Sequence, residues 1–117
     1  MPDLHDVRRI VLTLAGAEAA ADLQAFSVPH KGKLRSIAWV WRERVQPKKT
    51  KVPNLGVVAV HVSDLGEKEF LLDAHPDMIF TEPHYDGYPA ILVRLEVIDE
   101  TLLTQLLTNA WRYRTAG

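Results

Sequence analysis

Apolar residues recur along the chain with two different periods, and these periods predict the order of helices and strands. Near both ends the apolar positions are three or four residues apart, which is typical of amphipathic helices. The first helix is expected over residues 4–14, after the N-cap candidate Asp3. The last helix should begin after Asp99 and carry an apolar stripe that ends at Trp111.

Between these helices the pattern predicts short strands and one further helix. The strands are expected at residues 26–28, 34–41, 56–62, 78–81 and 90–97. The helix should begin after Asp64 and end at His75, which precedes a proline. Residues 42–54, which include two prolines and several charges, are expected to form a long loop between strands. The Ala-rich residues 15–22 fit either an extension of the first helix or a loop.

Two of the expected strands alternate, so their side chains can be assigned to faces. In the first, Ile37, Trp39 and Trp41 should share one face, opposite Ala38 and Val40. In the strand at 90–97, one face should carry four apolar residues: Ile91, Val93, Leu95 and Val97. Because the strands cluster between helices, the sequence predicts an α+β domain rather than an α/β one.

Length and composition fit one ordinary globular domain over residues 1–117. The absence of cysteine excludes disulfides and thiolate metal sites. No stretch has the pattern of a signal peptide or the roughly 20 apolar residues of a membrane span, so we expect a cytoplasmic protein.

Charge is distributed unevenly, although the net charge is only -1. Residues 30–51 carry eight of the 14 Lys and Arg and one of the 15 acids, Glu43, so the segment is +7 and the remainder -8. The bases are Lys31, Lys33, Arg35, Arg42, Arg44, Lys48, Lys49 and Lys51. Such separation favours an acidic partner, although a solvated loop accounts for it equally well.

The basic side chains of the expected loop form the first candidate site. They are Arg42, Arg44, Lys48, Lys49 and Lys51. At the tip of a long hairpin they could neutralise DNA phosphates without reading sequence. The alternative is that they keep an exposed loop soluble and prevent edge-to-edge strand pairing.

The turn PHYDGYP, at residues 83–89, is the second candidate site. His84, Tyr85 and Tyr88, with Arg94 on the next strand, could bind a small molecule or a protein. The alternative is structural, because Pro and Gly fix such turns and aromatic rings pack a sheet edge. The histidines lack metal-ligand spacing, and no catalytic triad or glycine-rich phosphate loop is present. We therefore expect no metal, no cofactor and no enzymatic activity.

Several short segments together resemble the MmcQ/YjbR family of small bacterial proteins. They are His75-Pro76-Asp77 with Phe80, residues 82–95 (EPHYDGYPAILVRL) and Ala110-Trp111-Arg112. The resemblance implies a two-layer sandwich of helices on a mainly antiparallel sheet, similar to the CyaY/frataxin fold. It also implies a double-wing DNA-binding protein, with the 42–51 loop as a wing. Frataxin-like iron binding would need an acidic first helix, whereas this one pairs Asp3 and Asp6 with two arginines.

Overall fold

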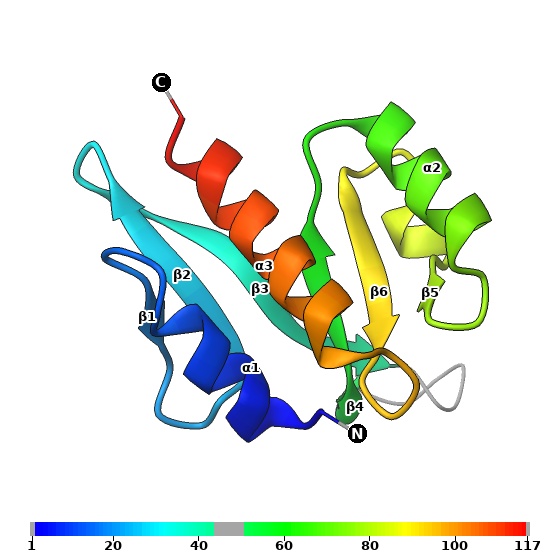
Figure 1. Cartoon of the computed structure of the whole chain (residues 1–117), viewed down its shortest axis with the longest axis horizontal. Coiled ribbons are helices and arrows are strands. Elements are labelled where there is room, and N and C mark those ends of the chain that lie inside the picture. Colours follow the sequence, from blue (N-terminus) through cyan, green and yellow to red (C-terminus); the bar gives the residue numbers. More distant parts are fainter. Residues whose placement is uncertain (1, 44–50, 117) are drawn as a thin grey trace.

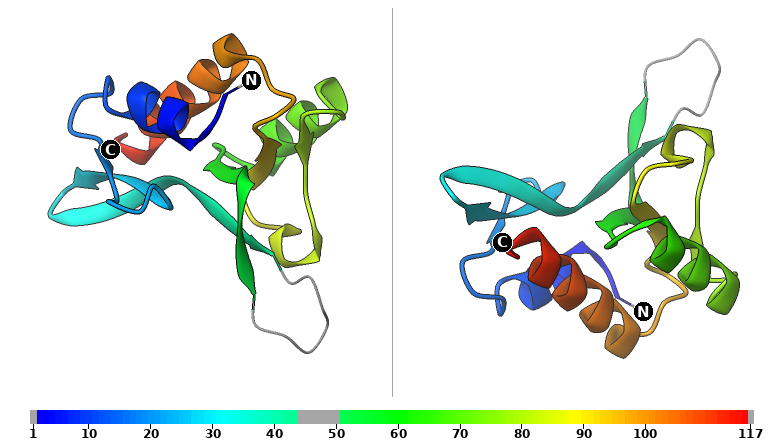
Figure 2. Two further views of the ribbon diagram at one scale, coloured as in Figure 1. Left: turned by 90° about the horizontal axis from the view of Figure 1, so that it is seen from below. Right: turned by 90° about the horizontal axis from the view of Figure 1, so that it is seen from above.

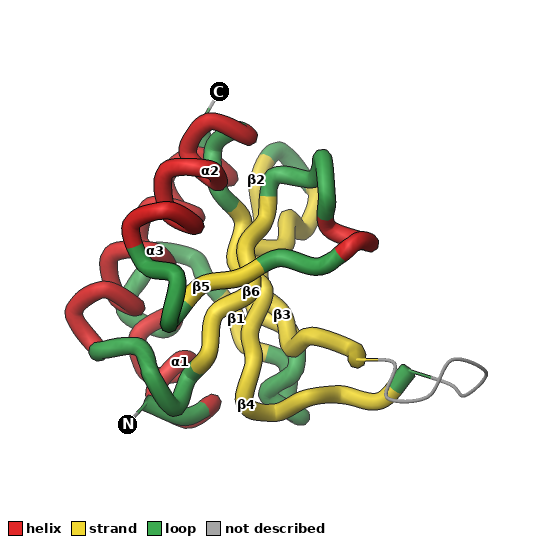
Figure 3. The backbone as a smooth tube through the Cα atoms, turned by 90° about the vertical axis from the view of Figure 1, so that its right-hand side faces the viewer, coloured by secondary structure: helices red, strands yellow, loops and turns green. Residues whose placement is uncertain are grey.

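Six antiparallel strands form one sheet, and all three α-helices cover the same face of it, as Figures 1 and 3 show. The computed structural model describes residues 2–43 and 51–116. The elements are α1 (Leu4–Val11), β1 (Glu18–Ala19), β2 (Ala25–His30), β3 (Lys33–Glu43), β4 (Val52–His61), α2 (Leu65–Ala74), β5 (Ile79–Phe80), the 3-10 turn η1 (Pro83–Tyr85), β6 (Ala90–Arg94) and α3 (Glu100–Arg114). The strand order is β1-β2-β3-β4-β6-β5. The predicted α+β sandwich is confirmed.

Local capping signals place the helices. Asp3 caps α1 within a reciprocal capping box with Asp6, Asp64 caps α2, and Asp99 caps α3. The first helix ends at Val11, three residues earlier than predicted, because the chain turns toward Gly16, whose φ of 75° suits glycine. His75 ends α2 as predicted.

Strand lengths differ from the sequence prediction because they depend on pairing. Residues 42–54 are not all loop: Arg42 and Glu43 extend β3, and β4 begins at Val52, since the two strands pair as far as Glu43 with Val52. Residues 18–19 of the Ala-rich segment add a short edge strand, β1, against β2. At the other end of the chain, β6 stops at Arg94 and the backbone turns.

Two predicted side-chain positions are wrong for related reasons. A β-bulge opposite Phe26 and Ser27 makes Ile37 the extra residue of β3, so Ile37 joins the core beneath the helices instead of sharing the face of Trp39. Because β6 ends at Arg94, Val97 falls in a turn and is exposed.

The sheet is apolar on both faces, which explains the continuous apolar run of β4. Val58 and Val60 belong to the main core under the helices. Val57 and Ala59 point the other way, into a smaller cluster on the face that none of the described α-helices covers. This second face, called here the open face, carries η1 and the projecting ends of β3 and β4 (Figures 2 and 3).

Candidate functional site

Aromatic side chains cover the open face in place of a helix. They are Trp39, Trp41, His61, Phe80, Tyr85 and Tyr88, called here the aromatic cluster. Strand alternation places Trp39 and Trp41 on this face of β3, while β4 supplies His61, β5 supplies Phe80 and the 82–88 turn supplies the two tyrosines. The cluster therefore joins side chains from β3, β4, β5 and the turn on one surface.

Three contacts hold the side chains of the cluster in place. The indole nitrogen Nε1 of Trp39 donates to the Tyr85 hydroxyl at 3.1 Å, and the two rings stack with centroids 6.5 Å apart. Trp41 meets Phe80 edge to face at 5.5 Å. The Arg94 guanidinium carbon also lies 4.0 Å from the Phe80 ring centroid, a cation–π contact.

His61 lies at the centre of the cluster and is 6% exposed. Its ring contacts Trp39 edge to face at 5.1 Å and Tyr88 at 5.7 Å. The pKa of His61 is lowered from 6.5 to about 4, mainly by burial and to a smaller extent by the charge of Arg114, while a hydrogen bond to the Pro89 backbone opposes the shift. At neutral pH His61 is therefore an uncharged, buried member of the aromatic cluster.

Acidification should destabilise the fold through His61. Between pH 6.5 and about 4 the unfolded chain binds a proton at His61 that the folded chain does not, so stability present above pH 6.5 is lost as the pH falls. We expect a loss of about 2 kcal/mol, allowing for relaxation around the charged ring. Urea unfolding at several pH values measures it. In the His61→Phe variant, the free energy of unfolding should depend less on pH between about 4 and 6.5, and an unchanged pH dependence would contradict the prediction. His5→Asn, at an exposed position, is the control and should keep the wild-type pH dependence.

The 82–88 turn is held by a buried lysine that the sequence analysis missed. Lys68 of α2 is 5% exposed, and its Nζ donates to the carbonyl oxygens of Tyr85 and Tyr88, the latter at 2.9 Å. Burial lowers the pKa of Lys68, and the Asp86 carboxylate opposes this shift. The spacing of Lys68 from Leu71 and Leu72, three and four residues further on, is the signal that could have placed it on the inner side of α2.

A cleft of about 230 Å³ opens between the β3–β4 hairpin and the 82–88 turn. It is lined by Trp41, Arg42, Glu43, Lys51, Glu82 and His84, and is called here the hairpin cleft. The Glu82 carboxylate caps η1 by accepting from the backbone N–H of His84 at 3.0 Å, and it lies 3.5 Å from His84 Nδ1. The cleft thus combines one aromatic ring, two cations and two carboxylates.

The structure brings the two sequence-predicted sites together. Arg42 and Lys51 from the first share the hairpin cleft with His84 from the second. Tyr85 and Tyr88 belong to the adjoining aromatic cluster. Arg94 packs on Phe80 of the same cluster but lines a separate hollow of about 200 Å³. Arg44, Lys48 and Lys49 lie outside the described residues.

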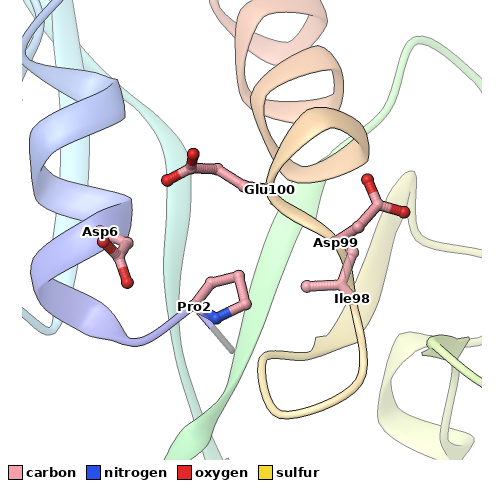
Figure 4. Close-up of a pocket in the computed structure, with 5 residues that line it drawn as sticks. All are labelled: Pro2, Asp6, Ile98, Asp99 and Glu100. Carbon is pink, nitrogen blue, oxygen red and sulfur yellow. The ribbon is translucent and has the colours of Figure 1, made fainter.

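A second hollow, of about 280 Å³, lies where α1 meets the start of α3 (Figure 4). Its carboxylates already serve the fold: Asp6 and Glu100 both pair with Arg9, and Asp99 caps α3. Within residues 2–43 and 51–116, no group of three or more histidine or acidic side chains is arranged to hold a metal ion. None of the described helices is long and apolar enough to cross a membrane.

Comparison with known proteins identifies relatives over almost the whole chain. The uncharacterized proteins Rv2570 of Mycobacterium tuberculosis and Mb2600 of Mycobacterium bovis are each 36% identical over 119 aligned positions, covering 95% of this chain and 87% of the relative. The crystal structure of Deinococcus radiodurans protein DR2400, with a DUF419 domain, matches with a TM-score of 0.67 and 22% identity, over 95% of this chain and 77% of that one. This likeness shows the fold alone. No family model matches the chain.

Proposed function

The chain belongs to the family that includes the mycobacterial protein Rv2570, and from its site we propose that it binds DNA weakly and without strong sequence preference. The observation that most strongly supports this proposal is the hairpin cleft, which Arg42 and Lys51 line together with Trp41. Cations for phosphates and an aromatic ring for bases are the two components of sequence-tolerant nucleic-acid sites. The open face provides both without a covering helix.

We also propose that this family is the MmcQ/YjbR family. Two observations support the assignment: the segments around PHYDGYP that resemble that family, and the fold shared with a DUF419 protein. On this view the β3–β4 hairpin, with the basic segment 42–51, acts as a DNA-binding wing. The described ends of these strands extend from the sheet on the side away from the three α-helices (Figure 3).

Fluorescence anisotropy with a labelled duplex at several salt concentrations tests the proposal. Three to five phosphate contacts give a log–log salt slope of about -3 to -4.5, with micromolar-range dissociation constants at low salt. Arg42→Ala/Lys51→Ala should weaken binding and reduce the slope by about 2. Arg8→Ala/Arg112→Ala removes the same charge from exposed positions on the helical side and should leave both values near wild type.

Two outcomes would overturn the proposal. One is the absence of binding at about 20 mM salt, where the screening length exceeds about 20 Å. The other is an equal loss in the two double variants, because the effect would then reflect net charge rather than the open face.

The second candidate function is the binding of a small molecule in the hairpin cleft. The cleft volume of about 230 Å³ favours this alternative only for a ligand smaller than drug-sized molecules, whose pockets begin at about 300 Å³. This alternative would be supported if wild type binds a small compound but no DNA, and if the His84→Ala variant no longer binds that compound.

A further inference from the structure

The hairpin cleft contains two carboxylates, which a simple phosphate-binding groove would not have. Residues 30–51 contain eight basic residues and one acidic residue, Glu43, and Glu43 lines the cleft together with Glu82. Next to a phosphate, a carboxylate repels and weakens binding. These two acceptors therefore suit a ligand group that donates hydrogen bonds.

Both carboxylates are held in place before any ligand arrives. Asn54 Nδ2 donates to Glu43 Oε2 at 3.0 Å, and Asn54 Oδ1 in turn accepts from the Gly56 backbone N–H at 3.0 Å. Glu82 is held by the backbone N–H of His84 at the start of η1. Fixed acceptors select a ligand because a mismatched ligand leaves them buried and unpaired.

The other walls of the cleft suit a planar ring joined to phosphates. Trp41 is half-buried and held edge to face by Phe80, so its indole is fixed while still lining the cleft. Arg42 and Lys51 lie close enough to line the same cleft and can contact the phosphates on either side of a base. A volume of about 230 Å³ suits one base rather than a stacked pair.

We propose that the hairpin cleft binds an unpaired nucleobase that carries an exocyclic amino group, which Glu43 and Glu82 accept while the ring lies against Trp41. This inference rests on the proposed DNA-binding function and makes the protein a single-strand binder by preference. In a duplex the Watson–Crick edge is already paired, so its amino group has only one hydrogen left to donate, in a groove. Cytosine, adenine and guanine offer this group, whereas uracil and thymine have a carbonyl oxygen, O4, where cytosine has its amino group, and their ring N3–H is the one donor left on that edge.

The test compares labelled oligodeoxycytidylate, oligodeoxyuridylate and a mixed-sequence duplex, each of about 15 units, at neutral pH and one low salt concentration. Cytosine and uracil rings have nearly the same size, so the comparison isolates the amino group. Wild type should bind the cytosine strand about fivefold or more tightly than the uracil strand, and more tightly than the duplex.

Glu43→Gln is the decisive variant because its amide can donate to a uracil oxygen. It should bring the cytosine-to-uracil ratio close to one. Glu18→Gln, at an exposed position on the far edge strand β1, removes the same charge and should keep the wild-type ratio. A thermal melt of each variant confirms that it is folded.

The outcomes separate this inference from the function on which it rests. Equal binding of the two strands by wild type, preference for the duplex, or equal changes in both variants would overturn the amino-group inference while DNA binding stands. No binding of any of the three nucleic acids would overturn the proposed function itself.

Discussion

Replacing Lys68 with methionine should lower the free energy of unfolding by about 2–4 kcal/mol. Methionine fills a similar volume but cannot donate, so the carbonyl oxygens of Tyr85 and Tyr88 lose their buried partner. Each unsatisfied buried acceptor costs about 1–3 kcal/mol, and the turn then loses its tie to α2. Denaturant unfolding of the variant and of wild type measures the loss.

An exposed lysine provides the control for Lys68. Lys33→Met, at the start of β3, should change stability by less than about 0.5 kcal/mol. If Lys68→Met lowers the free energy of unfolding by less than about 1 kcal/mol, water must satisfy the two carbonyl oxygens, and the turn must keep its conformation without Lys68. Because the turn carries His84, we also expect the Lys68→Met variant to bind any ligand of the hairpin cleft less tightly than wild type does.

Replacing Trp111 with alanine should cost about 2–3 kcal/mol. Trp111 ends the apolar stripe of α3 but is only half-buried, at the margin of the main core, so the expected loss is below the 3–5 kcal/mol typical of buried tryptophan. Its Nε1 donates to the Ala15 carbonyl at 2.9 Å and ties α3 to the segment after α1. Denaturant midpoints measure the effect.

A conservative variant separates the two contributions of Trp111. Trp111→Phe keeps much of the packing and loses the hydrogen bond, at a cost of about 1 kcal/mol. DNA binding should be unchanged in both variants, because α3 lies on the opposite side of the sheet from the projecting ends of β3 and β4 (Figure 3). A stability loss under about 1 kcal/mol for the alanine variant would mean that the ring contributes little to the fold.

The sequence by itself determined the features that depend on neighbours within a few residues. Three aspartates at helix N-caps, the apolar stripe of α3 and the end of α2 at His75 were all predicted correctly, because a cap or a stripe acts within one or two helical turns. The β-branched run of β4 likewise indicated a buried strand. These signals were enough for the α+β class.

Only the tertiary structure decided how the strands pair and what meets on the open face. The length of the β3–β4 hairpin, the bulge at Ile37 and the edge strand β1 depend on partner strands, which no local pattern specifies. The meeting of Arg42 with His84 and the burial of Lys68 depend on how the turn folds back over the sheet. The sequence therefore predicted three of the six residues of the hairpin cleft, Arg42, Lys51 and His84, as separate candidates, and the pairing of distant strands placed them in one cleft.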